Sequence, residues 1–149
     1  RSMVGTMAGI IDHQHLPDGR WLLHVVGRNR IEVTEWLKDS PYPRALVTEL
    51  PEQAGNATIQ RAQGVLKRMA DFTRQAHEMG YRINPVESTA VAAGLDVSEL
   101  SYRIAELLPV GPFDKQRLLA APTVAARLDL LEEEIGSLID ILSADGNKP

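Results

Sequence analysis

The stretch that decides the fold reads VGTMAGII (Val4–Ile11), LPDG (Leu16–Gly19) and WLLHVVGRNRI (Trp21–Ile31). Two runs rich in apolar and β-branched residues flank an Asp-Gly pair, which is a strong short-range signal for a β-hairpin. The sequence therefore predicts two antiparallel strands joined by a tight turn at Asp18-Gly19. Trp21–Val26 is apolar on both faces, so we expect that strand to be buried on both sides, as in a barrel.

Three histidines lie in this predicted hairpin. If the Asp-Gly pair is the whole loop, His13 directly opposes His24, and His15 lies on the same face. Two or three imidazoles could hold zinc or nickel. However, no carboxylate takes a matching position on that face, and apolar side chains share it. Surface or packed histidines are the better interpretation, so the sequence predicts no metal site and no cofactor.

Two more strands are expected before the composition changes. Ile31–Glu35 follows a sharp change of direction that Gly27 allows, and Ala45–Leu50 ends at a proline. Beyond them the apolar residues recur with a helical period. We therefore expect a β-sheet or partial-barrel subdomain over residues 1–52 and a helical bundle over residues 53–149.

The helical half contains several segments with recognisable ends. An amphipathic helix is predicted over 58–79, a short one over 87–93, and a further short one from residue 114. Asp96 and Ser98 are rival N-caps for a helix that ends at Leu108. The first helix has a basic face that could contact phosphates, formed by Arg61, Lys67, Arg68 and Arg74. This face has no interleaved aromatic residues, and an acidic last helix could neutralise it.

Composition narrows the function classes. The 149 residues are 44% hydrophobic and 24% charged, which is typical of a globular chain. The absence of cysteine excludes a disulfide framework and a cysteine nucleophile, and it suits a reducing cytoplasm. The net charge of −4 disfavours a general nucleic-acid binder, and no window is apolar enough for a membrane helix. We predict a cytoplasmic protein that binds neither nucleic acid nor membrane.

The last predicted helix runs from Val124 to about Ser143 and carries a heptad-like apolar seam. The seam residues are Val124, Leu128, Leu131, Ile135, Leu138 and Leu142. Burial within the bundle is the favoured interpretation, and a homodimer or partner seam is the alternative. The acidic run Glu132–Glu134 diverges around the helix axis, so it is interpreted as a solvated face with Arg127 nearby for pairing.

Three aromatic residues are candidates for a peptide-binding surface. Trp21 follows the hairpin turn, while Trp36 and Tyr42 flank a loop in which Pro41 and Pro43 keep the chain extended. Exposed aromatic side chains can form shallow apolar patches for other chains. No pattern of paired carboxylates and no activated serine, threonine or cysteine accompanies them, so the sequence nominates no catalytic residue.

The order of these segments resembles the amino-terminal substrate-binding domain of Lon proteases. The resemblance rests on the strand block quoted above with its Pro-Tyr-Pro bracket, and on three helical segments, Ile104–Pro109, Asp114–Leu119 and Arg127–Leu131. It implies an α+β fold, with a strongly bent antiparallel sheet or partial β-barrel (PUA-like) followed by a C-terminal α-helical bundle. It also implies a non-catalytic module that binds unfolded or partly folded polypeptides, or a specific protein partner.

Two departures from the family pattern qualify what the resemblance implies. Family members have further strands before the Val4-Gly5-Thr6 segment, so either the sequence is a fragment or another polypeptide completes the sheet. The sequence also contains no Gly-x-x-x-x-Gly-Lys-Ser/Thr loop and no serine–lysine pair in a peptidase context. We therefore predict a substrate-recognition or adaptor module, not an enzyme; the alternative is a scaffold that dimerises through the last helix.

Overall fold

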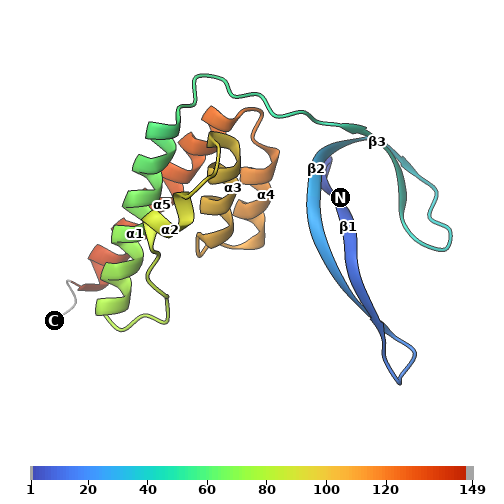
Figure 1. The fold of residues 1–149 in the computed structure, drawn as a ribbon, viewed down its shortest axis with the longest axis horizontal. Helices are drawn as coiled ribbons and strands as arrows, with labels where there is room; N and C mark the ends of the chain where they lie inside the picture. Colours follow the sequence, from blue (N-terminus) through green and yellow to red (C-terminus); the bar gives the residue numbers. More distant parts are fainter. Residues whose placement is uncertain (1, 147–149) are drawn as a thin grey trace. The chain divides into compact units, whose positions relative to one another are not determined.

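The computed structural model describes residues 2–146, which form three strands followed by five helices (Figure 1). In chain order the elements are β1 (Val4–His15), β2 (Trp21–Leu37), β3 (Arg44–Glu49), α1 (Ile59–Glu78), α2 (Ser88–Ala92), α3 (Val97–Leu107), α4 (Pro112–Ala120) and α5 (Val124–Gly146). The chain divides into two compact units: the sheet unit, Arg1–Pro51, and the helical unit, Glu52–Pro149. This boundary lies one residue from the predicted one.

The sheet unit is a single antiparallel sheet with strand order β1-β2-β3. The predicted change of strand at Gly27 is wrong, because β2 is one continuous strand of 17 residues. A bulge lies at this point instead: Thr6 pairs with Arg30, whereas Ala8 pairs with Gly27. Bulges increase twist and bend a strand, which accounts for the strong curvature of β2 in Figure 1.

The turn between β1 and β2 differs from the predicted two-residue loop. The Leu16 carbonyl accepts a hydrogen bond from the Gly19 amide at 3.0 Å, and the Leu16 amide donates to the Arg20 carbonyl at 2.8 Å. Pro17 therefore takes the first central position of a type I turn, which suits its fixed φ. Gly19 follows with a φ of 85°, so the loop has three residues. His15 consequently pairs with Trp21 rather than with Leu22.

The helical unit is built around a core shared by α1, α3 and α5. Core side chains that are nearly or fully buried include Ala62, Val65, Leu66, Met69, Leu100, Ile104, Leu128, Leu131 and Ile135. The Thr58 hydroxyl caps α1 by accepting from the Arg61 amide at 3.2 Å. Gly80, with a φ of 89°, follows the end of α1, as its sequence position predicts. These helices supply a conventional apolar interior for residues 52–146.

Asp96, not Ser98, caps α3. Its carboxylate accepts from the Glu99 amide at 2.8 Å, and the Glu99 carboxylate accepts from the Asp96 amide at 2.9 Å. This reciprocal pair is a capping box, in which two backbone donors at the helix start are satisfied. The cap therefore lies two residues before the Ser98 alternative.

Burial differs sharply between the two units. Among the described residues of the sheet unit, only Arg30 and Val33 are buried. The expectation that Trp21–Val26 is buried on both sides is wrong, since every one of these residues is exposed. The physical reason is that a single sheet of three strands provides no second layer within this unit to cover either face.

Candidate functional site: the exposed face of the sheet

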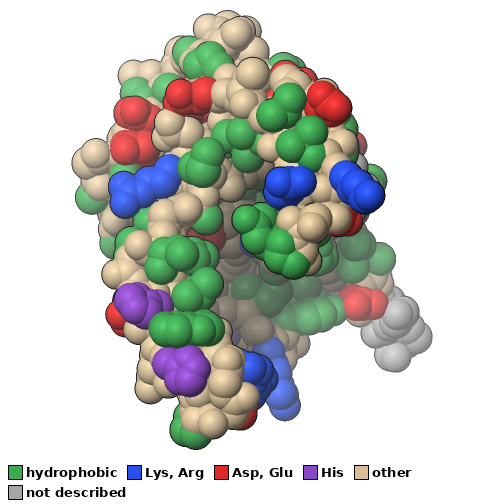
Figure 2. All heavy atoms as spheres, turned by 90° about the vertical axis from the view of Figure 1, so that its right-hand side faces the viewer, with side chains coloured by type: hydrophobic (Ala, Val, Ile, Leu, Met, Phe, Trp, Pro, Cys, Tyr) green, Lys and Arg blue, Asp and Glu red, His purple; other side chains and the backbone are tan. Residues whose placement is uncertain are grey.

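One face of the β1–β2 hairpin carries a run of exposed apolar side chains. Paired residues of antiparallel strands share a face, and the register places Ile10 beside Val25 and sets Trp21 and Leu23 along the same face. We call Ile10, Trp21, Leu23 and Val25 the hairpin patch; their exposed fractions are 62%, 59%, 47% and 55%. Figure 2 shows histidine side chains next to hydrophobic ones on the side of the molecule that it presents. Such a patch is typical of an interaction surface.

Two histidines adjoin the hairpin patch. The ring of His15 lies 4.9 Å from the Trp21 ring, edge to face, and the ring of His13 lies 5.5 Å from it. His24 lies on the opposite face, where its Nδ1 is 3.7 Å from an Asp12 carboxylate oxygen. The predicted opposition of His13 and His24 is therefore wrong, because the longer turn shifts the register by one residue and reverses the faces.

Across residues 2–146 no group of three or more histidine, cysteine, aspartate or glutamate side chains is close enough to hold an ion. The hairpin histidines are surface side chains that contact an indole or a carboxylate.

Within residues 2–146 no helix is long and apolar enough to cross a bilayer.

The three predicted aromatic contacts do not converge on one site. Trp36 lies near the end of β2, paired with Ala45 of β3, and is 37% exposed. Tyr42 lies in the adjoining β2–β3 loop and is 64% exposed. Trp21 begins β2 and is fifteen residues from Trp36, a separation of up to roughly 50 Å along an extended strand. The sheet unit therefore presents two separate aromatic positions.

Most side chains of the apolar seam of α5 are buried by packing within the helical unit. Leu128, Leu131 and Ile135 have no exposed surface, and Leu142 is 4% exposed. Leu138 is partly buried against the same core. The seam faces α1 and α3 of its own unit, which agrees with the favoured interpretation of burial within the bundle.

The basic face of α1 is partly neutralised within the helical unit. Arg61 forms ion pairs with Asp129 at 2.5 Å and with Glu132 at 3.0 Å. Hydrogen bonds to these two carboxylates, Glu132 first, raise the pKa of the Arg61 guanidinium. Arg74 pairs with Asp71 on its own helix. Because both arginines already bind carboxylates, less of this face is available for phosphate.

Arg127 is a residue whose role sequence reasoning missed. It has no exposed surface, and its ion pair is with Glu52, whereas the sequence placed it near the acidic run Glu132–Glu134. Its Nη2 instead donates to both carboxylate oxygens of Glu52 at 3.2 Å, and its Nη1 donates to the Ser101 hydroxyl at 2.9 Å. The guanidinium also lies 3.7 Å from the centre of the Tyr102 ring. This network anchors the first residue of the helical unit to α3 and α5.

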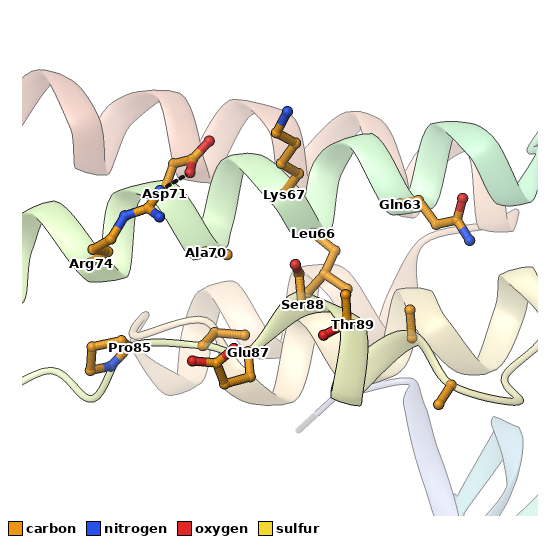
Figure 3. A pocket seen from close by; sticks show the side chains of 13 residues that line it. Gln63, Leu66, Lys67, Ala70, Asp71, Arg74, Pro85, Glu87, Ser88 and Thr89 are labelled. Atoms are coloured by element: carbon orange, nitrogen blue, oxygen red, sulfur yellow. Dashed lines mark hydrogen bonds and ion pairs between the residues drawn. The ribbon is translucent and has the colours of Figure 1, made fainter.

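A groove of about 710 Å³ lies between α1 and the segment that contains α2 (Figure 3). Leu66 and Ala70 of α1 form part of its apolar lining, while Ser88 and Thr89 of α2 lie across from them. In Figure 3 the Lys67 ammonium points away from the groove. No histidine lines it, so neither hydroxyl there has an imidazole base of the kind that nucleophilic catalysis uses.

The comparisons with known proteins agree with this architecture. Residues 2–136 match the family model described as "ATP-dependent protease La (LON) substrate-binding domain". Lon protease 2 of Herpetosiphon aurantiacus is 30% identical over 145 residues, covering 95% of this chain but 17% of that protein. Lon protease of Heliobacterium modesticaldum is 28% identical over 144 residues, covering 95% and 17%. The chain thus spans about a sixth of the length of these relatives.

Two solved structures share the fold. The N-terminal domain of the Mycobacterium avium complex Lon protease superposes with a TM-score of 0.66 at 19% identity, covering 90% of this chain and 70% of that one. A Lon N-terminal domain protein from Xanthomonas campestris gives a TM-score of 0.61 at 20% identity, covering 89% and 68%. Both the α+β fold and the family resemblance predicted from the sequence are confirmed: the chain belongs to the Lon substrate-binding domain family.

Proposed function

We propose that this chain is a non-catalytic module that binds unfolded or partly folded polypeptides through its sheet unit. The observation that carries the proposal is the exposure of large apolar side chains over the sheet, above all the hairpin patch. Removing apolar surface from water is the usual driving force for association, and it contributes about 25 cal/mol per Å² of surface covered. The description of the matching family as a substrate-binding domain supports the same role.

The strand order suggests how an extended polypeptide would bind. Among the described strands β1 and β3 are the outer ones, so each has one edge that faces no neighbouring strand. An extended segment can add to such an edge through backbone hydrogen bonds, while its alternate side chains contact the apolar surface. The hairpin patch spans β1 and the part of β2 that pairs with it, and Trp36 and Tyr42 lie at the β3 side.

The non-catalytic part of the proposal rests on the matching family, which is described as a substrate-binding domain. The groove between α1 and the segment that contains α2 has hydroxyls but no histidine, and its Arg74 and Asp71 side chains are paired with each other. The sequence also has no phosphate-binding glycine loop.

The test is a titration of the full chain with a fluorescently labelled polypeptide that cannot fold, followed by anisotropy. We expect saturable binding of the unfolded form and no binding of the same polypeptide when folded. Equal binding to both forms, or to neither, would contradict the proposal.

Both tryptophans lie in the sheet unit, so intrinsic fluorescence can locate the contact. Trp36→Phe leaves Trp21 as the reporter of the hairpin patch, and Trp21→Phe leaves Trp36 as the reporter of the β3 side. We expect the emission of the tryptophan that is covered to move to shorter wavelength on addition of unlabelled polypeptide. Binding without a shift in either variant would place the contact away from both positions.

A matched pair of variants separates a specific patch from general surface hydrophobicity. Leu23→Ser removes one exposed apolar side chain from the hairpin patch, and we expect it to weaken binding about tenfold. Phe113→Ser removes an apolar side chain that is 76% exposed in the helical unit. This control should leave the affinity unchanged, whereas an equal loss in both variants would indicate nonspecific adhesion.

A further inference from the structure

The contact of His13 and His15 with Trp21 has a functional consequence for the hairpin patch. We propose that protonation of these two histidines weakens the binding of apolar polypeptide to this surface, so that the module releases its client as the pH falls from 7.5 to 5.5. This inference rests on the proposed function, because it concerns regulation of the same binding surface.

The register places both imidazoles within the apolar surface, at its end nearest the turn. His15 is the direct cross-strand partner of Trp21, and His13 is the partner of Leu23. Both rings contact the Trp21 indole, with centroid distances of 4.9 and 5.5 Å. A polypeptide segment that covers Trp21 and Leu23 must therefore also cover at least part of both imidazoles.

The charged groups nearest to His13 and His15 lie on the opposite face of the hairpin or in its turn. Asp12 and His24 pair with each other on the opposite face of the hairpin. In the turn, Arg20 and Asp18 form their own ion pair at 2.6 Å. Along the paired strands, the described neighbours on the histidine face are the apolar members of the hairpin patch. No carboxylate on that stretch of the face can therefore compensate a protonated imidazole once a client covers it.

The sign of the effect follows from hydration. Histidine is the side chain that ordinarily changes charge between pH 5 and 8. A neutral imidazole can be covered by an apolar segment at modest cost, whereas a charged one loses water that no carboxylate replaces. The bound state therefore favours the neutral rings. Protonation of the rings therefore weakens binding.

The decisive experiment measures the affinity of the full chain for a labelled, histidine-free unfolded polypeptide at pH 7.5 and pH 5.5. We expect about tenfold weaker binding at pH 5.5, the change that exclusion of one protonated imidazole would produce. The double variant His13→Gln/His15→Gln should lose the pH dependence: at pH 5.5 it should retain most of its own pH 7.5 affinity, whatever that affinity is. His24→Gln, on the opposite face, is the matched control and should keep the wild-type pH dependence.

A second readout needs no client. In the Trp36→Phe variant, protonation of imidazoles in contact with Trp21 should quench its emission, and the double histidine variant should abolish this titration. If the client fails to bind at pH 7.5, the proposed function is wrong whatever Trp21 does. If the client binds with the same affinity at both pH values, or if His24→Gln alone removes the dependence, the pH inference is overturned and the proposed function stands.

Discussion

At the scale of single residues, Arg127 shows how one side chain organises its surroundings. A guanidinium with no exposed surface requires both a counter-charge and hydrogen-bond acceptors. Glu52 supplies the carboxylate, and the Leu118 carbonyl accepts from the Arg127 Nε at 3.1 Å. The backbone joins this arrangement nearby, because the Val124 amide donates to the Gln53 carbonyl at 2.8 Å. The segment that begins the helical unit is thereby held against α5.

Removing the carboxylate should leave the buried charge without its counter-ion. We expect Glu52→Gln to lower the free energy of unfolding of the helical unit by about 2–3 kcal/mol, somewhat below the full cost of breaking a buried pair, because the Glu52 side chain is 30% exposed. Glu106→Gln is the matched control, since it breaks the exposed pair with Arg103 and should cost under about 0.5 kcal/mol. Urea unfolding followed by circular dichroism measures both; equal losses would contradict a special role for Glu52.

The position of Arg127 could have been predicted in part. It lies three residues after Val124 and four before Leu131, so the helical period already places it on the apolar side of α5. The partner could not have been predicted in this way, because Glu52 is 75 residues away in the sequence. Closeness in the sequence favours pairing of Arg127 with the acidic run Glu132–Glu134, whereas the tertiary fold brings Glu52 to the buried guanidinium.

At the scale of elements, every predicted strand and helix segment has a counterpart, while register and continuity were less predictable. The hairpin strands follow from apolar patterning, but Pro17 selects a type I turn with Gly19 after it, and this shifts every cross-strand pair. This shift alone explains why His13 and His15 have other cross-strand partners than the sequence predicted. The capping box of α3 was readable from Asp96 and Glu99, which have the required spacing of three residues.

The α5 seam yields a prediction that separates packing from dimerisation. Leu131 is fully buried, so Leu131→Lys should place an ammonium in the core and cause loss of the helical circular dichroism signal or severe destabilisation. Ile141, which is 62% exposed on the same helix, is the matched control, and Ile141→Lys should leave the fold intact. If Leu131→Lys instead converts a dimer into folded monomers by light scattering, the scaffold alternative replaces the packing interpretation.

At the scale of the whole molecule, the two units have different kinds of stability. The helical unit contains a buried apolar core, whereas the described part of the sheet unit buries only two side chains. Hydrophobic burial is the main favourable term in folding, so we expect the sheet unit to be the less stable of the two. Both tryptophans lie in the sheet unit and all five helices lie in the helical unit, so separate optical signals report on each.

Leu66→Ala tests whether the units unfold independently. Leu66 is 1% exposed in the helical core, so the truncation should cost about 2–5 kcal/mol and lower the denaturation midpoint measured by circular dichroism at 222 nm. The midpoint measured by tryptophan fluorescence should not move, because neither tryptophan belongs to that core. Leu46→Ala, at a side chain 51% exposed on β3, is the control and should leave the circular dichroism midpoint unchanged. If Leu66→Ala shifts both midpoints together, the units unfold as one cooperative structure, and substitutions in the bundle would then alter the polypeptide-binding surface through stability alone.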